Sequence, residues 1–165
     1  MENMKKIELT QNQYALVDDE DFDKLNQYKW CAQYSSGVES FYAVRGENQK
    51  ILLMHRIIMN TPRGMQTDHV NHNTLDNRKE NLRICTGSQN QMNLIKHKKA
   101  ASNYKGVTIV KKMYKNTIYK YWYARICVNR KVIELGYFRN EIQAVKAYNK
   151  KAKELFGEYA LLNKI

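Results

Sequence analysis

The sequence is poor in the residues that shape secreted and membrane proteins. Its 165 residues include one proline, seven glycines and three cysteines, and no apolar run approaches the roughly 20 residues that cross a bilayer. Cys31, Cys85 and Cys127 are odd in number and far apart, which argues against a disulfide framework or a structural zinc site and predicts three small buried residues. No apolar segment of a signal peptide follows the first residues. We therefore expect a cytoplasmic protein without membrane contact.

Acidic residues are scarce in one part of the chain. Residues 1–60 carry a net charge of −2, residues 61–100 carry +4 and residues 101–165 carry +10, within a total of +12. A basic C-terminal third indicates that one module binds a polyanion. Hydrophobic residues make up 43% of the chain, enough for a packed core, so the chain is not a disordered tail.

The hydrophobic periodicity predicts the α+β class. In the first part we expect a small β-rich scaffold, whose acidic run at 18–23 begins a helix and does not bind metal. In the last part, Trp122, Ala124, Ile126 and Val128 alternate on one face of a strand in a three-stranded antiparallel sheet. The expected strands are 6–9, 14–17, 30–34, 41–45, 51–54, 65–70, 82–86, 121–128 and 132–138. The expected helices begin at residues 18, 54, 88 and 140, and Ser88 and Asn140 are expected to cap the last two. The last helix should end at Gly157, and its inward residues should be Ile142, Val145, Tyr148, Ala152 and Leu155.

The candidate chemistry lies between the scaffold and the basic third. Asp68 and His69 are adjacent, Asn81 follows His69 by 12 residues and Asn90 follows it by 21. A strand hairpin and a helix can bring a carboxylate and an amide oxygen onto one divalent cation, and such ligands suit Mg²⁺ or Mn²⁺. The imidazole beside them can accept a proton from water near neutral pH.

The stretch from Asp68 to Asn93 resembles the HNH (ββα-metal) nucleases, especially the phage and intron-encoded homing endonucleases. It matches their pattern in Asp68-His69-x-Asn71, Asp76-Asn77-Arg78, Asn81-Leu82-Arg83 and Gln89-Asn90-x-x-Asn93. The resemblance implies a metal bound by Asp68 and Asn90, a general base at His69, and Asn81 holding the loop and the base in geometry. It also implies a phage or mobile-element origin.

Other polar residues of this stretch have less specific interpretations. His55 would pack or position a phosphate, and His72 would be an exposed residue or a phosphate contact. His97 is expected in the linker. Asn73, Asp76 and Asn77 are expected to form the loop through bonds to their own backbone.

Five short motifs lie along residues 103–163: Tyr104-Lys105-Gly106-Val107, Trp122-x-Ala124-x-Ile126, Leu135-Gly136-x-Phe138, Ala144-x-x-Ala147-Tyr148 and Ala160-Leu161-Leu162-Asn163. With these motifs the segment resembles the AP2/ERF DNA-binding domain, whose sheet enters the major groove. The resemblance implies DNA contacts from Lys105, Thr108 and Arg125 on the free face, with Lys111 and Lys112 nearer the phosphates. Val110, Cys127 and Glu134 stand where the plant relatives have arginine or tryptophan, so their target sequence does not transfer.

Together these features predict a monomeric, metal-dependent homing endonuclease that nicks one strand of double-stranded DNA. Residues 1–97 would hold the scaffold and the HNH motif (55–97), residues 98–102 a linker, and residues 103–165 the domain that selects the site. The basic linker is either solvated or lies along phosphates. The alternative is a sequence-specific DNA-binding regulator with a vestigial nuclease site, and an RNA-binding protein is disfavoured because the sheet lacks the aromatic pattern of RNA-recognition motifs.

Overall fold

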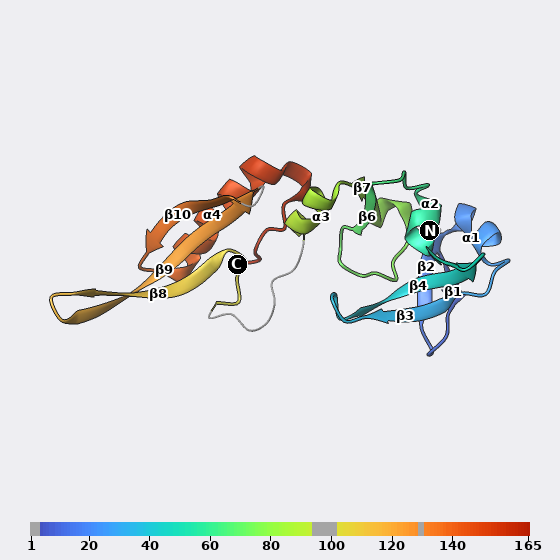
Figure 1. Cartoon of the computed structure of the whole chain (residues 1–165), viewed down its shortest axis with the longest axis horizontal. Helices are drawn as coiled ribbons and strands as arrows, with labels where there is room; N and C mark the ends of the chain where they lie inside the picture. The colour runs from blue at the N-terminus through green and yellow to red at the C-terminus, as the bar shows by residue number, and fades with distance from the viewer. Residues whose placement is uncertain (1–3, 94–101, 129–130) are drawn as a thin grey trace. The chain divides into compact units, whose positions relative to one another are not determined.

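The computed structural model describes residues 4–93, 102–128 and 131–165. It has the mixed α+β composition expected from the sequence, with several small antiparallel sheets and few helices (Figure 1). The chain divides into two compact units, Met1–Asn90 and Gln91–Ile165. Among the described residues, no helix is both long and apolar enough to cross a membrane.

The first unit begins with the expected scaffold. β1 (Met4–Glu8) pairs with β2 (Tyr14–Asp18), and β3 (Cys31–Ser35), β4 (Ser40–Glu47) and β5 (Lys50–Leu53) form a second antiparallel sheet. The acidic residues lie in the first turn of α1 (Asp19–Leu25), where the helix dipole favours them. The core of this unit consists of Ile7, Ala15, Val17, Leu25, Trp30, Ala43 and Met54.

A ββα arrangement follows the scaffold, as the motif predicts. The short helix α2 (Met54–Ile58) precedes β6 (Gln66–His69), a 3₁₀ turn η1 (Lys79–Asn81), β7 (Leu82–Cys85) and α3 (Gly87–Asn93). β6 and β7 are antiparallel partners, with Asp68 opposite Arg83 and His69 opposite Leu82.

The described residues 102–128 and 131–165 of the second unit form a three-stranded antiparallel sheet and one α-helix. The strands β8 (Val107–Tyr114), β9 (Thr117–Val128) and β10 (Lys131–Phe138) lie in the order β10-β9-β8. The helix α4 (Glu141–Phe156) is followed by η2 (Gly157–Tyr159). Asn140 caps α4 as predicted, because its side chain accepts a hydrogen bond from the backbone N–H of Ile142.

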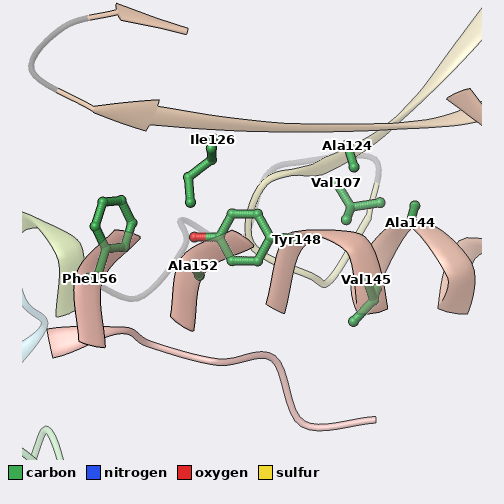
Figure 2. Packing of buried hydrophobic residues seen from close by; sticks show 8 residues of the cluster. All are labelled: Val107, Ala124, Ile126, Ala144, Val145, Tyr148, Ala152 and Phe156. Atoms are coloured by element: carbon green, nitrogen blue, oxygen red, sulfur yellow. The ribbon is translucent and has the colours of Figure 1, made fainter. Parts of the chain in front are cut away.

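Alternation along β9 gives the sheet one covered face and one free face. One buried cluster joins Val107, Ala124 and Ile126 of the sheet to α4, which contributes Ala144, Val145, Tyr148, Ala152 and Phe156 (Figure 2). Each large apolar side chain buried there contributes roughly 1.5–3 kcal/mol. The inward position expected for Leu155 is wrong: Leu155 is exposed, and Phe156 packs inward in its place because the last turn brings it under the sheet.

Gly106 makes a close approach that a larger residue could not make. Its φ is +74°, and a Cβ at this position would lie 2.1 Å from Cδ2 of Tyr148 and 2.6 Å from the carbonyl oxygen of Arg125. The backbone therefore passes directly over the aromatic ring of α4, which glycine alone permits.

Two cysteine predictions are wrong. Cys85 is fully buried, but Cys31 and Cys127 are exposed. Cys127 belongs to the free face of β9, and Cys31 begins β3 on the side that points away from the core. Because neither face was covered by another element, a small apolar residue there stays at the surface.

Candidate active site

The scaffold fixes the loop that connects β6 to β7. The backbone N–H of Leu16 in β2 donates to the carbonyl of Leu75, and the N–H of Asn77 donates to the carbonyl of Leu16, both at 2.8 Å. The hydroxyl of Thr74 also donates to the carbonyl of Phe41 in β4, at 2.5 Å. These hydrogen bonds anchor the loop to two strands of the scaffold, β2 and β4.

Asp68 and His69 lie at the end of β6 and are buried. Asp68 retains 8% of its surface exposed and His69 4%. The carboxylate Oδ2 of Asp68 accepts hydrogen bonds from Nε and Nη2 of Arg83, at 3.0 and 2.7 Å. The guanidinium compensates the charge that burial would otherwise penalise.

His69 has a partner that fixes its tautomer. The Nδ2 of Asn77 donates to the carbonyl of Leu75 at 3.2 Å, so the amide oxygen Oδ1 faces Nε2 of His69 at 3.4 Å. An amide oxygen only accepts, so Nε2 carries the proton and Nδ1 carries the basic lone pair. Burial lowers the pKa of His69 below its ordinary value, against smaller opposing effects of the Asn77 bond and of Asp68. The imidazole is therefore neutral, and able to accept a proton, at physiological pH.

Two further aromatic rings surround this imidazole. The ring of His55, from α2, contacts His69 edge to face with 4.9 Å between centroids, and Tyr42, from β4, lies 6.1 Å from His69. Burial lowers the pKa of His55 to about 3, with a smaller effect of His69. His55 is thus a neutral ring packed against the candidate base, which favours the packing interpretation over a phosphate contact.

Asn81 is bonded within the loop. Its Oδ1 accepts from the backbone N–H of Asn71 at 2.9 Å, and its Nδ2 donates to the carbonyl of Asp76 at 2.7 Å. These bonds join the two ends of the loop. The amide that faces the imidazole is that of Asn77, one of the residues expected from the sequence to serve only the loop.

Asn77 was missed because its sequence signal is indirect. It stands between Asp76 and Arg78, whose side chains form a two-point ion pair at 2.8 Å that anchors the loop. An amide buried to 1% exposure needs a partner, and here the partners are Leu75 and His69. The Asp-Asn-Arg triplet marks the position, but burial is what distinguishes it from an ordinary loop asparagine.

The helix α3 brings Asn90 toward β6. The predicted cap at Ser88 is wrong, because α3 begins at Gly87 and the preceding residue, Thr86, caps it. Thr86 Oγ1 accepts from the N–H of Gln89, and Gln89 Oε1 accepts from the N–H of Thr86, a reciprocal pair that satisfies two helix-end donors. Asn90 Nδ2 then donates to Oε1 of Gln66 at 2.8 Å, and Gln66 precedes Asp68 by two residues in β6.

The two candidate ligands belong to the residue types that a hard cation takes. A carboxylate of Asp68 and an amide oxygen of Asn90 are oxygen ligands of the type that Mg²⁺ takes, with water and substrate phosphate completing its shell. Within residues 4–93, 102–128 and 131–165, no group of three or more His, Cys, Asp and Glu side chains is arranged to hold a metal ion.

The candidate DNA-contacting residues do not all face the same way. Arg125 and Thr108 lie on the face of the sheet opposite α4, with Arg125 exposed and Thr108 partly exposed. Lys111 and Lys112 are exposed, and the ammonium of Lys112 lies 3.4 Å from the ring centroid of Tyr137. Lys105 instead points inward: its Nζ donates to the carbonyl of Met92 at 2.6 Å, and burial lowers its pKa to about 8.

Of the two remaining histidines, the structure describes His72 but not His97. His72 is partly buried in the loop and has a left-handed backbone, with φ of +63°. His97, and the predicted linker 98–102 apart from Ser102, lie outside the described residues. Their suggested roles stay predictions.

Comparisons with known proteins agree with the geometry of β6, β7 and α3. The family model of HNH endonucleases matches residues 54–92. A protein of Acanthamoeba polyphaga mimivirus, named as an uncharacterized HNH endonuclease, is 33% identical over 152 residues, which cover 92% of this chain and 75% of the viral protein. No solved structure matches the chain significantly. The chain therefore belongs to the HNH endonuclease family and is a nuclease.

Proposed function

We propose that this nuclease is a metal-dependent homing endonuclease that hydrolyses one phosphodiester bond of double-stranded DNA per binding event. The observation that carries the proposal is the imidazole of His69, which is buried, neutral and held by Asn77 in the tautomer with a basic Nδ1. A base in this state accepts a proton from water at neutral pH.

The proposed reaction assigns one step to each residue. His69 Nδ1 takes a proton from the water that attacks phosphorus in line. The bond to the 3′ oxygen breaks and this oxygen takes a proton from solvent, which gives 5′-phosphate and 3′-hydroxyl ends. Asp68 and Asn90 would hold Mg²⁺, or Mn²⁺, which supplies Lewis-acid stabilisation of the negative charge on the phosphate and the leaving oxygen. Asn81 keeps the loop closed through Asn71 and Asp76, so that Asn77 stays beside His69.

We further propose that residues 103–165 form an AP2-like domain that selects the cleavage site, separate from the nuclease region 1–97. Support comes from the three-stranded antiparallel sheet, from the helix packed on one of its faces, and from the exposed free face that carries Arg125. Lys105 is left out of this face because its ammonium bonds inside the unit.

One nuclease motif per chain favours a monomer that nicks one strand. A phage- or mobile-element-encoded enzyme that acts in the cytoplasm of its host is the corresponding biological setting. The viral source of the similar HNH protein agrees with a mobile origin.

Conversion of supercoiled plasmid to open circles tests the nuclease mechanism. Wild type would be compared with His69→Ala and with Val70→Ala, a neighbouring residue that is 45% exposed. We expect nicking in Mg²⁺ or Mn²⁺ but not in EDTA, a loss of about 10²–10⁴-fold in His69→Ala, and little change in Val70→Ala. Equal nicking by wild type and His69→Ala would refute the assignment of the base.

The regulator hypothesis makes the opposite prediction. DNA fragments selected by binding would be retained by wild type yet remain uncut with either metal. That result would assign the chain to site-specific binding and reject the proposed catalytic step, whereas cutting of the selected fragments would reject the regulator.

A further inference from the structure

The β8–β9 hairpin is longer than the sheet to which it belongs. The two strands pair from Val107–Ala124 out to Tyr114–Thr117, but β10 pairs only with residues 122–128 of β9. Residues 111–120, here called the ribbon, therefore continue past the end of β10 (Figure 1). All ten residues of the ribbon are exposed.

The ribbon is regular up to its tip. Its four strand pairs keep an uninterrupted register, and the two turn residues Lys115 and Asn116 have φ of +44° and +58°. Two consecutive left-handed residues form the tight turn whose twist matches that of paired strands. The ribbon is thus a built two-stranded projection rather than an irregular loop.

Its charge has one sign. Lys111, Lys112, Lys115 and Lys120 lie in the ribbon, and the sequence from 102 to 133 contains no acidic residue. Lys111 lies directly opposite Lys120 in the pairing, where like charges repel. Such an arrangement is stabilised by a polyanion that neutralises both ammonium groups.

Apolar side chains are exposed beside these lysines. Met113 is 75% exposed and Ile118 is 62% exposed, and the two are cross-strand partners at the tip. Tyr114 and Tyr119 are 64% and 44% exposed on the other face of the ribbon. A methionine–isoleucine pair does not bind phosphates, whereas apolar side chains can insert between the base pairs of a duplex.

We propose that the ribbon is a DNA-binding arm. It would lie in the minor groove next to the segment that the three-stranded face contacts, with its lysines at the phosphates and the Met113–Ile118 pair against a base step, which bends the duplex. The inference rests on the proposed function in one respect, namely that duplex DNA is the partner of the second unit.

The salt dependence of binding tests the lysines. Affinity for an end-labelled 30-base-pair duplex of mixed sequence would be measured by fluorescence anisotropy at several salt concentrations. Lys111→Gln/Lys120→Gln should reduce the slope of log K against log salt by about 2, because two phosphate contacts are lost. The charge-matched control is Lys146→Gln/Lys150→Gln, at exposed positions of α4, and should keep the wild-type slope.

The apolar tip has a separate test. Met113→Ala/Ile118→Ala should weaken binding about tenfold and reduce the bend seen by energy transfer between the duplex ends, with the salt slope unchanged. Leu155→Ala/Leu162→Ala, at positions 39% and 41% exposed in the same unit, should leave both readouts unchanged. Circular dichroism would verify that all variants stay folded.

These outcomes decide the proposal independently of cleavage, because binding is measured in EDTA. Wild-type slope in the lysine variant, wild-type affinity and bend in the tip variant, or tighter binding of single-stranded RNA than of duplex DNA would each overturn the arm. Absence of plasmid nicking would refute the nuclease mechanism and leave the binding result standing.

Discussion

The two units of this chain use polar residues in opposite ways. In the first unit Asp68, His69, Asn77 and Asn81 are all buried. Their side chains are hydrogen-bonded, Asp68 to Arg83, His69 to Asn77, and Asn81 to Asn71 and Asp76. In the second unit the buried residues of the core are almost entirely apolar, and the charged groups proposed to contact DNA lie on the surface. The first arrangement adjusts the chemistry of a few groups, and the second presents many groups to a large partner.

This difference has a physical cause. Burial lowers the pKa of His69 and the Asn77 amide fixes its tautomer, but each buried polar atom then depends on a specific partner. Exposed groups such as Arg125 need no partner, because water solvates them and the apolar face of the same sheet provides the stability. Substitutions should therefore have coupled effects in the first unit and separable effects in the second.

The largest expected effect is a loss of stability that is confined to the second unit. Gly106→Ala would place a Cβ 2.1 Å from the Tyr148 ring at a positive φ, and should destabilise this unit by about 3 kcal/mol or more. Thermal unfolding would show it, together with loss of DNA binding. The control is Gly46→Ala in β4, which has no atom within 4 Å of the added methyl. Wild-type unfolding of Gly106→Ala would contradict the close approach.

The next effect tests the buried network of the first unit. Asn77→Ala should reduce the cleavage rate about 10–100-fold, because His69 loses the acceptor that fixes its tautomer. The Asn77 bond also raises the pKa of His69, so the acid limb of the pH–rate profile should move to lower pH in the variant. A merely structural role would reduce the rate without this shift. Asn73→Ala, at an exposed position in the same loop, serves as the control.

A smaller effect concerns stability against pH. The pKa of His55 is about 3 in the folded protein, against about 6.5 when unfolded, so its contribution to stability is complete above pH 6.5 and declines as the pH falls toward 3. His55→Phe keeps a ring beside His69 but cannot titrate. Between pH 7 and pH 4 its Tm should fall by about 5–10 °C less than that of wild type. If the Tm of wild type and of His55→Phe fell in parallel with pH, burial would not lower the pKa of His55 in the folded protein.

The smallest effect isolates one exposed cation. Arg125→Gln should change the free energy of unfolding by less than about 0.5 kcal/mol and reduce the salt slope of DNA binding by about 1. Arg139→Gln, at an exposed position beyond β10, is the charge-matched control. An unchanged slope in Arg125→Gln would remove this residue from the proposed DNA face.

Much of the fold could be predicted from local pattern. Alternation of Trp122, Ala124 and Ile126 indicated the covered face of β9, and Asn140 and Gly157 indicated the ends of α4. The cap at Ser88 and the inward position of Leu155 failed because several neighbouring residues satisfy the same local pattern. Packing decides that Phe156 and not Leu155 points inward, and reciprocal hydrogen bonds with Gln89 decide that Thr86 and not Ser88 is the cap.

The family could be predicted from the spacing of Asp68, His69, Asn81 and Asn90, and the location of the positive charge could be read from the sequence as well. Which asparagine lies beside the imidazole, in contrast, depends on tertiary packing. Asn77 and Asn81 both lie in the same polar stretch, but the pairing of Leu16 with the loop turns Asn77 toward His69. Tertiary packing likewise turns Lys105 inward and leaves Lys111 and Lys112 exposed, because the direction of a side chain follows from what packs beside it.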